Sequence, residues 1–266
     1  MQMNHYTFFK NLHLGEKPFI LPNAWDPLSA IILEQVGFKA LGTTSWGMAN
    51  ARGQNDSEQC DFETFLEQTR RIISAVKLPV TVDIESGYSD DHAQICEHVL
   101  QIARLGAVGI NIEDSSKCSN SLRSMKDQAE ILSKLKHVLR NEGYSEFFIN
   151  ARSDVFLVDD YCIDDALSRI TTYQLSGADG IFLPGLNDEK VIEKVIQSIS
   201  IPVNLMALKS LINYQKAALL GINRLSIGNG LSDATISFIH QIANLMYKEN
   251  DLTALFDHPE MSLQLI

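Results

Sequence analysis

The sequence predicts an α/β protein built as a (β/α)8 barrel of the TIM type, and three observations support this. Eight short apolar runs of strand length recur along the chain, segments of helical periodicity separate them, and a glycine often stands where a helical segment gives way to a strand. Strands that alternate with helices are typical of a parallel sheet, and glycine accepts the left-handed conformation that ends a helix. A chain of 266 residues is an ordinary length for one such barrel, so we expect residues 1–266 to form a single domain.

The expected strands follow one another along the whole chain. They lie around 19–22, 40–44, 80–84, 109–112, 147–151, 180–183, 203–206 and 224–227. The competing architecture is a doubly wound open sheet. That fold usually carries a glycine-rich phosphate turn after its first strand, and this chain has none there.

Helical patterns fill the intervals between the expected strands. Clear examples are 91–105, 125–141 and 164–175. The segment Ser89-Asp90-Asp91-His92 looks like the cap and first turn of the first of these helices, so we assign its acids to helix capping. Glycine joints of the kind described above occur at Gly37, Gly106, Gly177 and Gly221.

The composition argues against several classes of partner. A formal net charge of -11 makes nucleic acid a poor partner, and no basic run suggests a membrane surface. No stretch approaches the length of an apolar membrane span, and the first residues lack the apolar core of a signal peptide. The four cysteines, Cys60, Cys96, Cys118 and Cys162, show no CxxC pair, which fits a reducing compartment, and we expect all but Cys118 to be packing residues. We therefore expect a soluble cytoplasmic protein.

Three of the expected strands run into acidic or polar residues at their C-terminal ends, in the segments 80–87, 109–114 and 147–154. Side chains on a strand alternate between its two faces. The alternation pairs Asp83 with Glu85, Asn111 with Glu113, and Asn150 with Arg152. The carboxyl ends of barrel strands form the mouth where active sites lie, so these groups are expected to converge. Crowded carboxylates repel one another unless a proton or a cation neutralises them, and a divalent metal is the simplest cation.

The candidate metal ligands are Asp83, Glu85 and Glu113. A set made only of oxygen ligands favours Mg²⁺, with Mn²⁺ as an alternative, bound through few direct carboxylates and several waters. His92 and His98 do not share a helical face, so no histidine pair competes for zinc. The alternative interpretation is that these acids are solvated loop carboxylates.

Candidate substrate-binding residues also follow strand ends. Arg152 either forms a structural salt bridge to Glu113 or Asp154, or holds a substrate carboxylate by two parallel hydrogen bonds. On the second strand, the segment 43–47 either supplies hydroxyl and backbone N–H groups to an anionic oxygen or forms a plain turn; its candidate residues are Thr44, Ser45, Trp46 and Gly47. Asn204 occupies the corresponding place on the seventh strand.

Taken in order, these segments resemble the isocitrate lyase/phosphoenolpyruvate mutase superfamily over nearly the full chain. The matching segments are Leu21–Ala30, Gly42–Ser45, Asn55-Asp56, Val82–Tyr88, Gly109–Asp114 and Asn150–Asp154. The fourth of these, Val-Asp-Ile-Glu-Ser-Gly-Tyr, is similar to the Asp-x-Asp-x-Gly-Tyr metal motif of the family, with Glu85 in place of the second aspartate.

The resemblance implies a barrel that assembles into a homo-oligomer, a tetramer or a dimer, with the last helix exchanged between neighbouring subunits. It implies Mg²⁺ bound directly by Asp83 and through waters by Asp56, Glu85 and Glu113. Family substrates are small oxo- or hydroxy-carboxylates in which a C–C or P–C bond next to a carbonyl breaks or forms. Arg152 would hold the substrate carboxylate, and the metal would stabilise the enolate that develops.

The loop at 115–123 distinguishes the subfamilies. Lys117 and Cys118 resemble part of the Lys-Lys/Arg-Cys-Gly-His motif of the lyases, but Ser119 and Asn120 replace the glycine and histidine. Asn120-Ser121 matches the end of the Lys-Thr-Asn-Ser motif of the mutases and phosphonopyruvate hydrolases. Lys117, Cys118, Asn120 and Ser121 are therefore candidate catalytic residues, with Cys118 either an acid/base or an incidental loop cysteine. The whole chain best resembles the branch of the superfamily whose members have no assigned chemistry.

Three functions remain open at the level of sequence. The first is a Mg²⁺-dependent lyase that cleaves a C–C bond in a small 2-oxo- or 2-hydroxy-carboxylate. The second is mutase or hydrolase chemistry on a P–C bond, and the third is a barrel that binds a keto acid without turnover.

Overall fold

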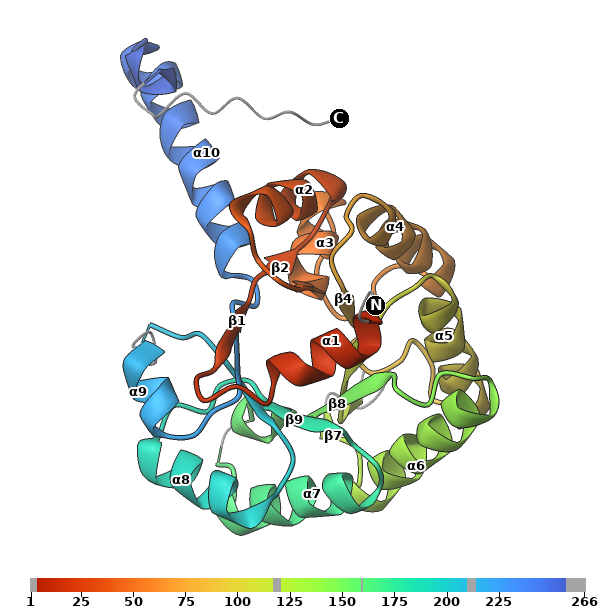
Figure 1. Cartoon of the computed structure of the whole chain (residues 1–266). Helices are drawn as coiled ribbons and strands as arrows, with labels where there is room; N and C mark the ends of the chain where they lie inside the picture. Colours follow the sequence, from red (N-terminus) through yellow and green to blue (C-terminus); the bar gives the residue numbers. More distant parts are fainter. Residues whose placement is uncertain (1–3, 117–120, 159, 210–213, 257–266) are drawn as a thin grey trace.

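The computed structural model describes residues 4–116, 121–158, 160–209 and 214–256. The main sheet is entirely parallel, with strand order β1-β11-β10-β9-β8-β5-β4-β3-β2, and it curves into a barrel surrounded by helices (Figure 1). The predicted α/β barrel is confirmed.

All eight predicted strand regions carry strands. They are β1 (Phe19–Leu21) with β2 (Asn23–Ala24), β3 (Leu41–Thr43), β4 (Val80–Asp83), β5 (Gly109–Glu113), β8 (Phe148–Arg152), β9 (Gly180–Leu183), β10 (Val203–Met206) and β11 (Arg224–Ser226). The first strand region is divided into β1 and β2 because Pro22, which has no N–H to donate, interrupts its backbone hydrogen bonds. Strand β1 pairs with β11 and strand β2 pairs with β3, so this region brings the two edges of the sheet together.

The helices form the outer layer. They are α2 (Pro27–Val36), α3 (Ser45–Ala51), α4 (Phe62–Ser74), α5 (His92–Arg104), α6 (Met125–Asn141), α7 (Ile163–Leu175), α8 (Glu189–Ser198) and α9 (Tyr214–Leu219). Three of them match the predicted helical patterns within two residues, and Asp91 caps α5 by accepting a hydrogen bond from Ala93 N at 2.9 Å, as expected. Their apolar faces pack on the outer surface of the strands in one large cluster that includes Ile95, Leu132 and Ile170.

A short helix, α1 (His5–Leu12), closes the end of the barrel opposite the mouth. Its Phe9 packs with Ala40, Val108 and Phe148, which lie at or just before the N-terminal ends of β3, β5 and β8. Figure 1 shows α1 lying across this end of the barrel. The carboxyl ends of the strands therefore form the end that is open to ligands.

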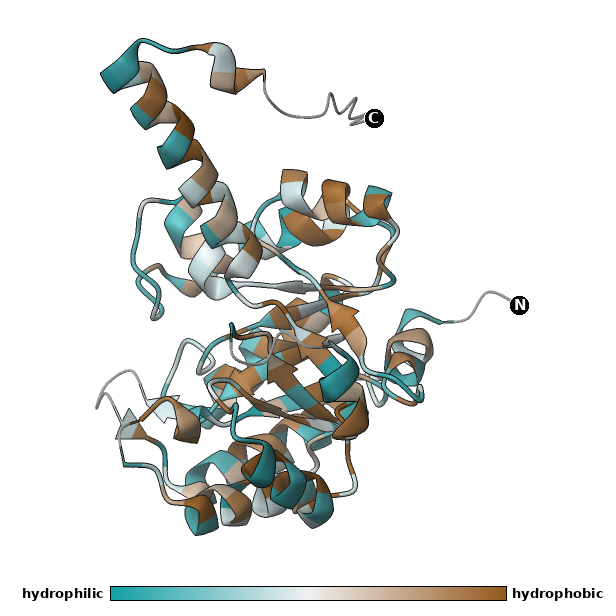
Figure 2. Ribbon diagram, turned by 90° about the vertical axis from the view of Figure 1, so that its left-hand side faces the viewer, coloured by the Kyte–Doolittle hydropathy of each residue, from teal (hydrophilic) through white to brown (hydrophobic). Residues whose placement is uncertain are grey.

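The remaining elements are small or lie outside the barrel wall. They are the hairpin of β6 (Ser115–Ser116) and β7 (Ser121–Leu122), the 3₁₀ turns η1 (Asp154–Phe156) and η2 (Thr253–Leu255), and α10 (Gly230–Glu249). Helix α10 projects away from the barrel (Figures 1 and 2). It leaves large apolar side chains exposed, among them Ile236, Phe238 and Ile239. Across the described residues, no helix combines the length and the apolar character needed to cross a membrane.

Candidate active site at the carboxyl end of the barrel

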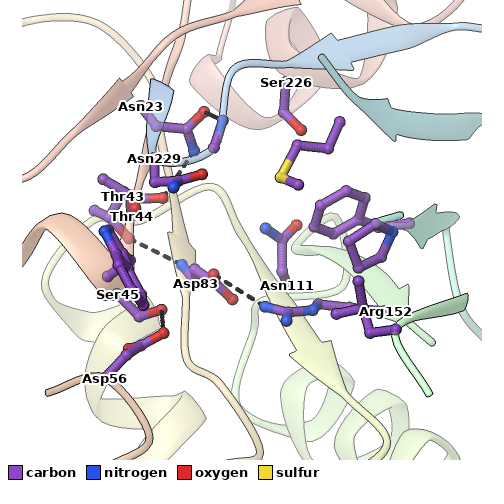
Figure 3. Close-up of a pocket in the computed structure, with 16 residues that line it drawn as sticks. Asn23, Thr43, Thr44, Ser45, Asp56, Asp83, Asn111, Arg152, Ser226 and Asn229 are labelled. Carbon is purple, nitrogen blue, oxygen red and sulfur yellow. Dashed lines mark hydrogen bonds and ion pairs between the residues drawn. The ribbon is translucent and has the colours of Figure 1, made fainter. Parts of the chain in front are cut away.

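A small cavity of about 170 Å³ opens at the carboxyl end of the strands (Figure 3). Its walls come from most of the barrel strands and from the loops that follow them. Lining residues include Asn23, Thr43, Thr44, Ser45, Trp46, Asp56, Asp83, Asn111, Arg152, Phe182, Met206, Ser226 and Asn229. A second cavity adjoins it, shares Asp56 and Arg152, and adds Glu113, Ser115, Ser121 and Asp154. The first cavity is large enough for a small acid.

Arg152 is the central charge of the mouth. It lies at the end of β8, beside Glu113 in the parallel register, and its side chain is 17% exposed. Nη1 lies 2.9 Å from Glu113 Oε2 and 3.5 Å from Asp83 Oδ2, and Nε lies 2.6 Å from Asp154 Oδ1. Burial by itself would lower the pKa of the guanidinium, but the charges of Glu113, Asp154 and Asp83 outweigh it and raise this pKa well above its ordinary value. Arg152 is thus a permanent cation, and both interpretations offered by the sequence remain compatible with its position.

Among the described residues at this point, three carboxylates face one guanidinium. Asp83, at the end of β4, is fixed through its backbone, because its N–H donates to Thr43 Oγ1 at 2.9 Å. The excess of negative charge favours binding of a cation, or of a cation together with an anionic ligand. The same excess explains how a buried arginine is tolerated here.

Asp56 carries a further indication that this site can bind a cation. Its Oδ2 is 3.4 Å from Ser45 Oγ, while its Oδ1 is buried and has no hydrogen-bond partner among the described residues. A buried carboxylate oxygen left without a donor is costly, and a metal ion or a metal-bound water would satisfy it. Within the described part of the chain, no three histidine, cysteine or acidic side chains lie close enough together to form a complete cage. Mg²⁺ sites in proteins generally use few direct carboxylates and several waters, so they do not need such a cage.

The position of Glu85 differs from the alternation that the sequence predicted. Strand β4 ends at Asp83, and Glu85 adopts a left-handed backbone conformation with φ of 52°. This turn directs the carboxylate away from the cavity lining, to the backbone N–H of Glu58 at 3.0 Å and the hydroxyl of Tyr88 at 3.1 Å. The expected pairing of Asp83 with Glu85 on one strand face is wrong, because the strand does not continue far enough to impose it.

Glu58 is a structural residue that the sequence did not reveal. Its Oε1 accepts hydrogen bonds from Ser86 N at 2.9 Å, Ser86 Oγ at 2.6 Å and Tyr88 N at 3.1 Å. Together with the bond from its own N–H to Glu85, this carboxylate fastens the loop after β4 to the loop after α3. Burial, with a smaller contribution from the Glu85 charge, raises the pKa of Tyr88.

The segment after β3 begins helix α3 at the edge of the cavity. Thr44 caps this helix by accepting from Gly47 N at 3.4 Å, and Thr44, Ser45 and Trp46 all line the cavity. Trp46 also donates from Nε1 to Asp233 of α10 at 3.0 Å. Gly47 is not among the lining residues; a Cβ there would meet Thr44 Cγ2 and Trp25 Cβ at 2.8 Å each, so packing requires this glycine.

Other predicted residues fall in different places. Asn204 is buried below the lining, and neither atom of its amide has a hydrogen-bond partner among the described residues. Lys117, Cys118 and Asn120 lie outside the described residues, whereas Ser121 begins β7 and lines the second cavity. The expectation that Cys162 packs inside the protein is wrong: it precedes α7 and is exposed.

Sequence reasoning also missed several lining residues. Asn23 lies beside β3 and β11, donates to Thr43 O at 2.8 Å, and accepts from Gly228 N at 2.9 Å. Phe182 and Met206 contribute apolar wall, and Ser226 contributes a hydroxyl. Their positions at the ends of predicted strands were the only available signal.

Known proteins share the sequence pattern and the fold of this chain. The family model described as phosphoenolpyruvate phosphomutase matches residues 9–247. An uncharacterized protein of Mycobacterium tuberculosis is 34% identical over 222 residues, which cover 83% of this chain and 81% of that protein. Oxaloacetate decarboxylase 1 of Pseudomonas fluorescens is 25% identical over 257 residues, which cover 92% of this chain and 87% of that enzyme. A crystal structure of a candidate lyase/mutase from Burkholderia cenocepacia J2315 has a TM-score of 0.90 at 29% identity, and the match covers 96% of this chain and 92% of that one.

Proposed function

This chain belongs to the phosphoenolpyruvate phosphomutase family, within the isocitrate lyase/phosphoenolpyruvate mutase superfamily, and we propose that it is a Mg²⁺-dependent lyase. Its substrate would be a small 2-oxo- or 2-hydroxy-carboxylate in which a C–C bond next to the oxygen-bearing carbon is cleaved. The observation that carries the proposal is the position of Arg152, which faces three carboxylates at the mouth of a cavity the size of a small acid.

The residues present fit a metal of this kind. Asp83 would bind it directly, and Asp56 and Glu113 would bind it through waters; Asp56 has the unsatisfied buried oxygen described above. Glu85, which already binds the Glu58 N–H, is the weakest of the four proposed ligands. When bound there, a divalent cation supplies Lewis-acid stabilisation to the negative charge that develops as the bond breaks.

Side chains of the protein would hold the substrate and limit its contact with water. Arg152 presents a planar fork that exchanges one of its present carboxylate partners for the carboxylate of the substrate. Phe182, whose ring lies 5.8 Å from the guanidinium carbon, supplies an apolar wall that limits water near the reacting bond. Lys117, Cys118, Asn120 and Ser121 remain predicted catalytic residues, with Cys118 either an acid/base or an incidental loop cysteine.

The test is a substrate panel with a matched control. The purified protein is incubated with Mg²⁺ and oxaloacetate, methylisocitrate or substituted malates, and released pyruvate or glyoxylate is measured. We expect product from at least one compound, loss of that product in Asp83→Asn, and strong loss in Arg152→Lys, which keeps the charge but removes the fork. A folded protein that binds Mg²⁺ and yields no product from the whole panel contradicts the proposal. Tight binding of a 2-oxo acid in that case would favour the barrel that binds without turnover.

A second candidate is chemistry on a P–C bond. The description of the family model and the Asn120-Ser121 sequence favour it. Phosphorus NMR of phosphonopyruvate incubated with the protein and Mg²⁺ tests this candidate. A spectrum that stays unchanged excludes it.

We also propose that the protein is a homo-oligomer in which a second copy covers the exposed apolar residues of α10. Ile236, Phe238 and Ile239 on this projecting helix support the proposal, because a monomer would leave them in water. Light scattering on the wild-type protein and on a chain shortened before α10 tests it. A monomeric wild type contradicts it.

A further inference from the structure

The interior of the barrel directly beneath the cavity is unusually polar. Asn150, Asn204 and Arg224 are buried there, on β8, β10 and β11, and Asn111 of β5 is buried where this layer meets the cavity. The interior of such barrels is ordinarily filled by branched apolar side chains. A polar layer in this place requires a reason, and the hydrogen bonds of the layer supply one.

Arg224 is the residue of this layer whose burial is energetically most unfavourable. It is 0% exposed, and its Nε and Nη1 have no hydrogen-bond partners among the described residues. Its guanidinium carbon lies 5.9 Å from the ring of Phe9 and 5.8 Å from the ring of Phe148, and no carboxylate among the described residues pairs with it. Burial lowers its pKa to about 9. Replacing such a group by an apolar one would stabilise most folds, so its presence points to function.

The one hydrogen bond that the Arg224 side chain makes among the described residues determines how Asn111 is oriented. Asn111 Oδ1 accepts from Arg224 Nη2 at 3.4 Å and from Asn150 Nδ2 at 2.8 Å. A guanidinium has only donors, so the atom of Asn111 that faces it must be the oxygen and not the nitrogen. Because two donors from the interior hold the Asn111 oxygen, the NH₂ group of Asn111 can donate toward the cavity. Asn111 lines the cavity, where Figure 3 shows it between Asp83 and Ser226.

We infer that Asn111 donates a hydrogen bond to an anionic oxygen of the bound substrate, and that Arg224 is the positioning residue that holds the Asn111 amide in this orientation. The inference rests on the proposed function, because it assigns the recognition of one oxygen of the small carboxylate. Asn111 lies beside Asp83 in the register of β4 and β5, so it would supply a neutral donor next to an acidic wall. Such a donor selects substrates that place an oxygen at this point, because a substrate without one leaves the buried amide unsatisfied.

Oxalate is a suitable probe, because it is a planar dianion shaped like the enolate of a 2-oxo acid. Calorimetry with Mg²⁺ present gives its Kd for the wild type, Asn111→Leu, Arg224→Met and the double variant. Thr81→Val is the matched control: Thr81 is buried on the neighbouring strand β4, its hydroxyl has no partner among the described residues, and the change keeps its shape.

We expect each of Asn111→Leu and Arg224→Met to raise the oxalate Kd about tenfold or more, which is the usual worth of a hydrogen bond to a charged group. The double variant should bind no more weakly than Asn111→Leu alone, because Arg224 acts through Asn111. Arg224→Met should also melt at a higher temperature than the wild type, which a purely structural role would not produce. Thr81→Val should keep the wild-type Kd.

The outcomes separate this inference from the proposed function. A wild type that fails to bind oxalate with Mg²⁺ overturns both. A wild type that binds, together with a folded Asn111→Leu of equal affinity, overturns the inference alone. Additive losses in the double variant overturn the role of Arg224 and leave that of Asn111. Because Asn111→Leu tests the contact directly, the inference stays testable even if Arg224→Met fails to fold.

Discussion

Replacing Arg152 by methionine should destabilise the protein strongly, and the structure indicates by how much. The guanidinium contacts Glu113 at 2.9 Å and Asp154 at 2.6 Å, with Asp83 at 3.5 Å, and the side chain of Glu113 is 2% exposed. Removing the cation leaves these acids to repel one another in a buried place. Breaking a buried pair in this way typically costs about 3–5 kcal/mol. Since whole domains are stable by about 5–15 kcal/mol, the loss should be easy to measure.

Urea unfolding of the wild type and of Arg152→Met, at pH 7 and without Mg²⁺, measures this difference. Arg152→Lys is the matched control, because it keeps the charge and should lose less than the methionine variant. Adding Mg²⁺ should restore part of the lost stability, by about 2.7 kcal/mol when the free ion is a hundredfold above its Kd.

The pKa of Arg152 lies well above its ordinary value, so the arginine stays charged throughout the pH range of the experiment. A methionine variant within about 1 kcal/mol of the wild type at pH 7 would show that these acids do not need a cation, which refutes the basis of the metal proposal as well.

Three further predictions concern separate parts of the molecule. Asp83→Ala should abolish Mg²⁺ binding in calorimetry at little cost in stability, because the loss of one of the crowded carboxylates offsets the loss of its contacts; normal metal affinity in this variant contradicts the assignment. Gly47→Ala should lower stability by about 1–3 kcal/mol, because its Cβ would meet Thr44 and Trp25 at 2.8 Å; an unchanged melting temperature shows that this turn is looser than described. Burial, and then the charge of Arg224, hold the pKa of His13 well below its ordinary value. As the pH falls, His13 therefore takes up a proton in the unfolded chain before it does so in the folded protein. The wild type should lose stability as the pH falls below about 6.5. Melting curves between pH 4.5 and 7 should show a flatter dependence for His13→Phe, and equal slopes for the two proteins contradict this.

The barrel could be predicted from the sequence because its signals are local. Apolar runs of strand length, helical periodicity and glycine joints each depend on residues close together in the chain. These signals located all eight strand regions of the sheet and the helix cap at Asp91. The same reasoning placed Arg152 near Glu113, because both stand at the ends of predicted strands and those strands proved to be neighbours in register.

The sequence by itself thus determined the fold, the family and the end of the barrel at which charged groups gather. Only the tertiary structure decided which of those groups face the cavity. Glu85 turns away because one left-handed residue ends the alternation and Glu58, distant in sequence, supplies a partner. Asn111 gains its orientation from Arg224, which lies 113 residues further along the chain. Periodicity reports which face of an element a residue occupies, but the direction of a polar side chain depends on donors and charges that other strands bring beside it.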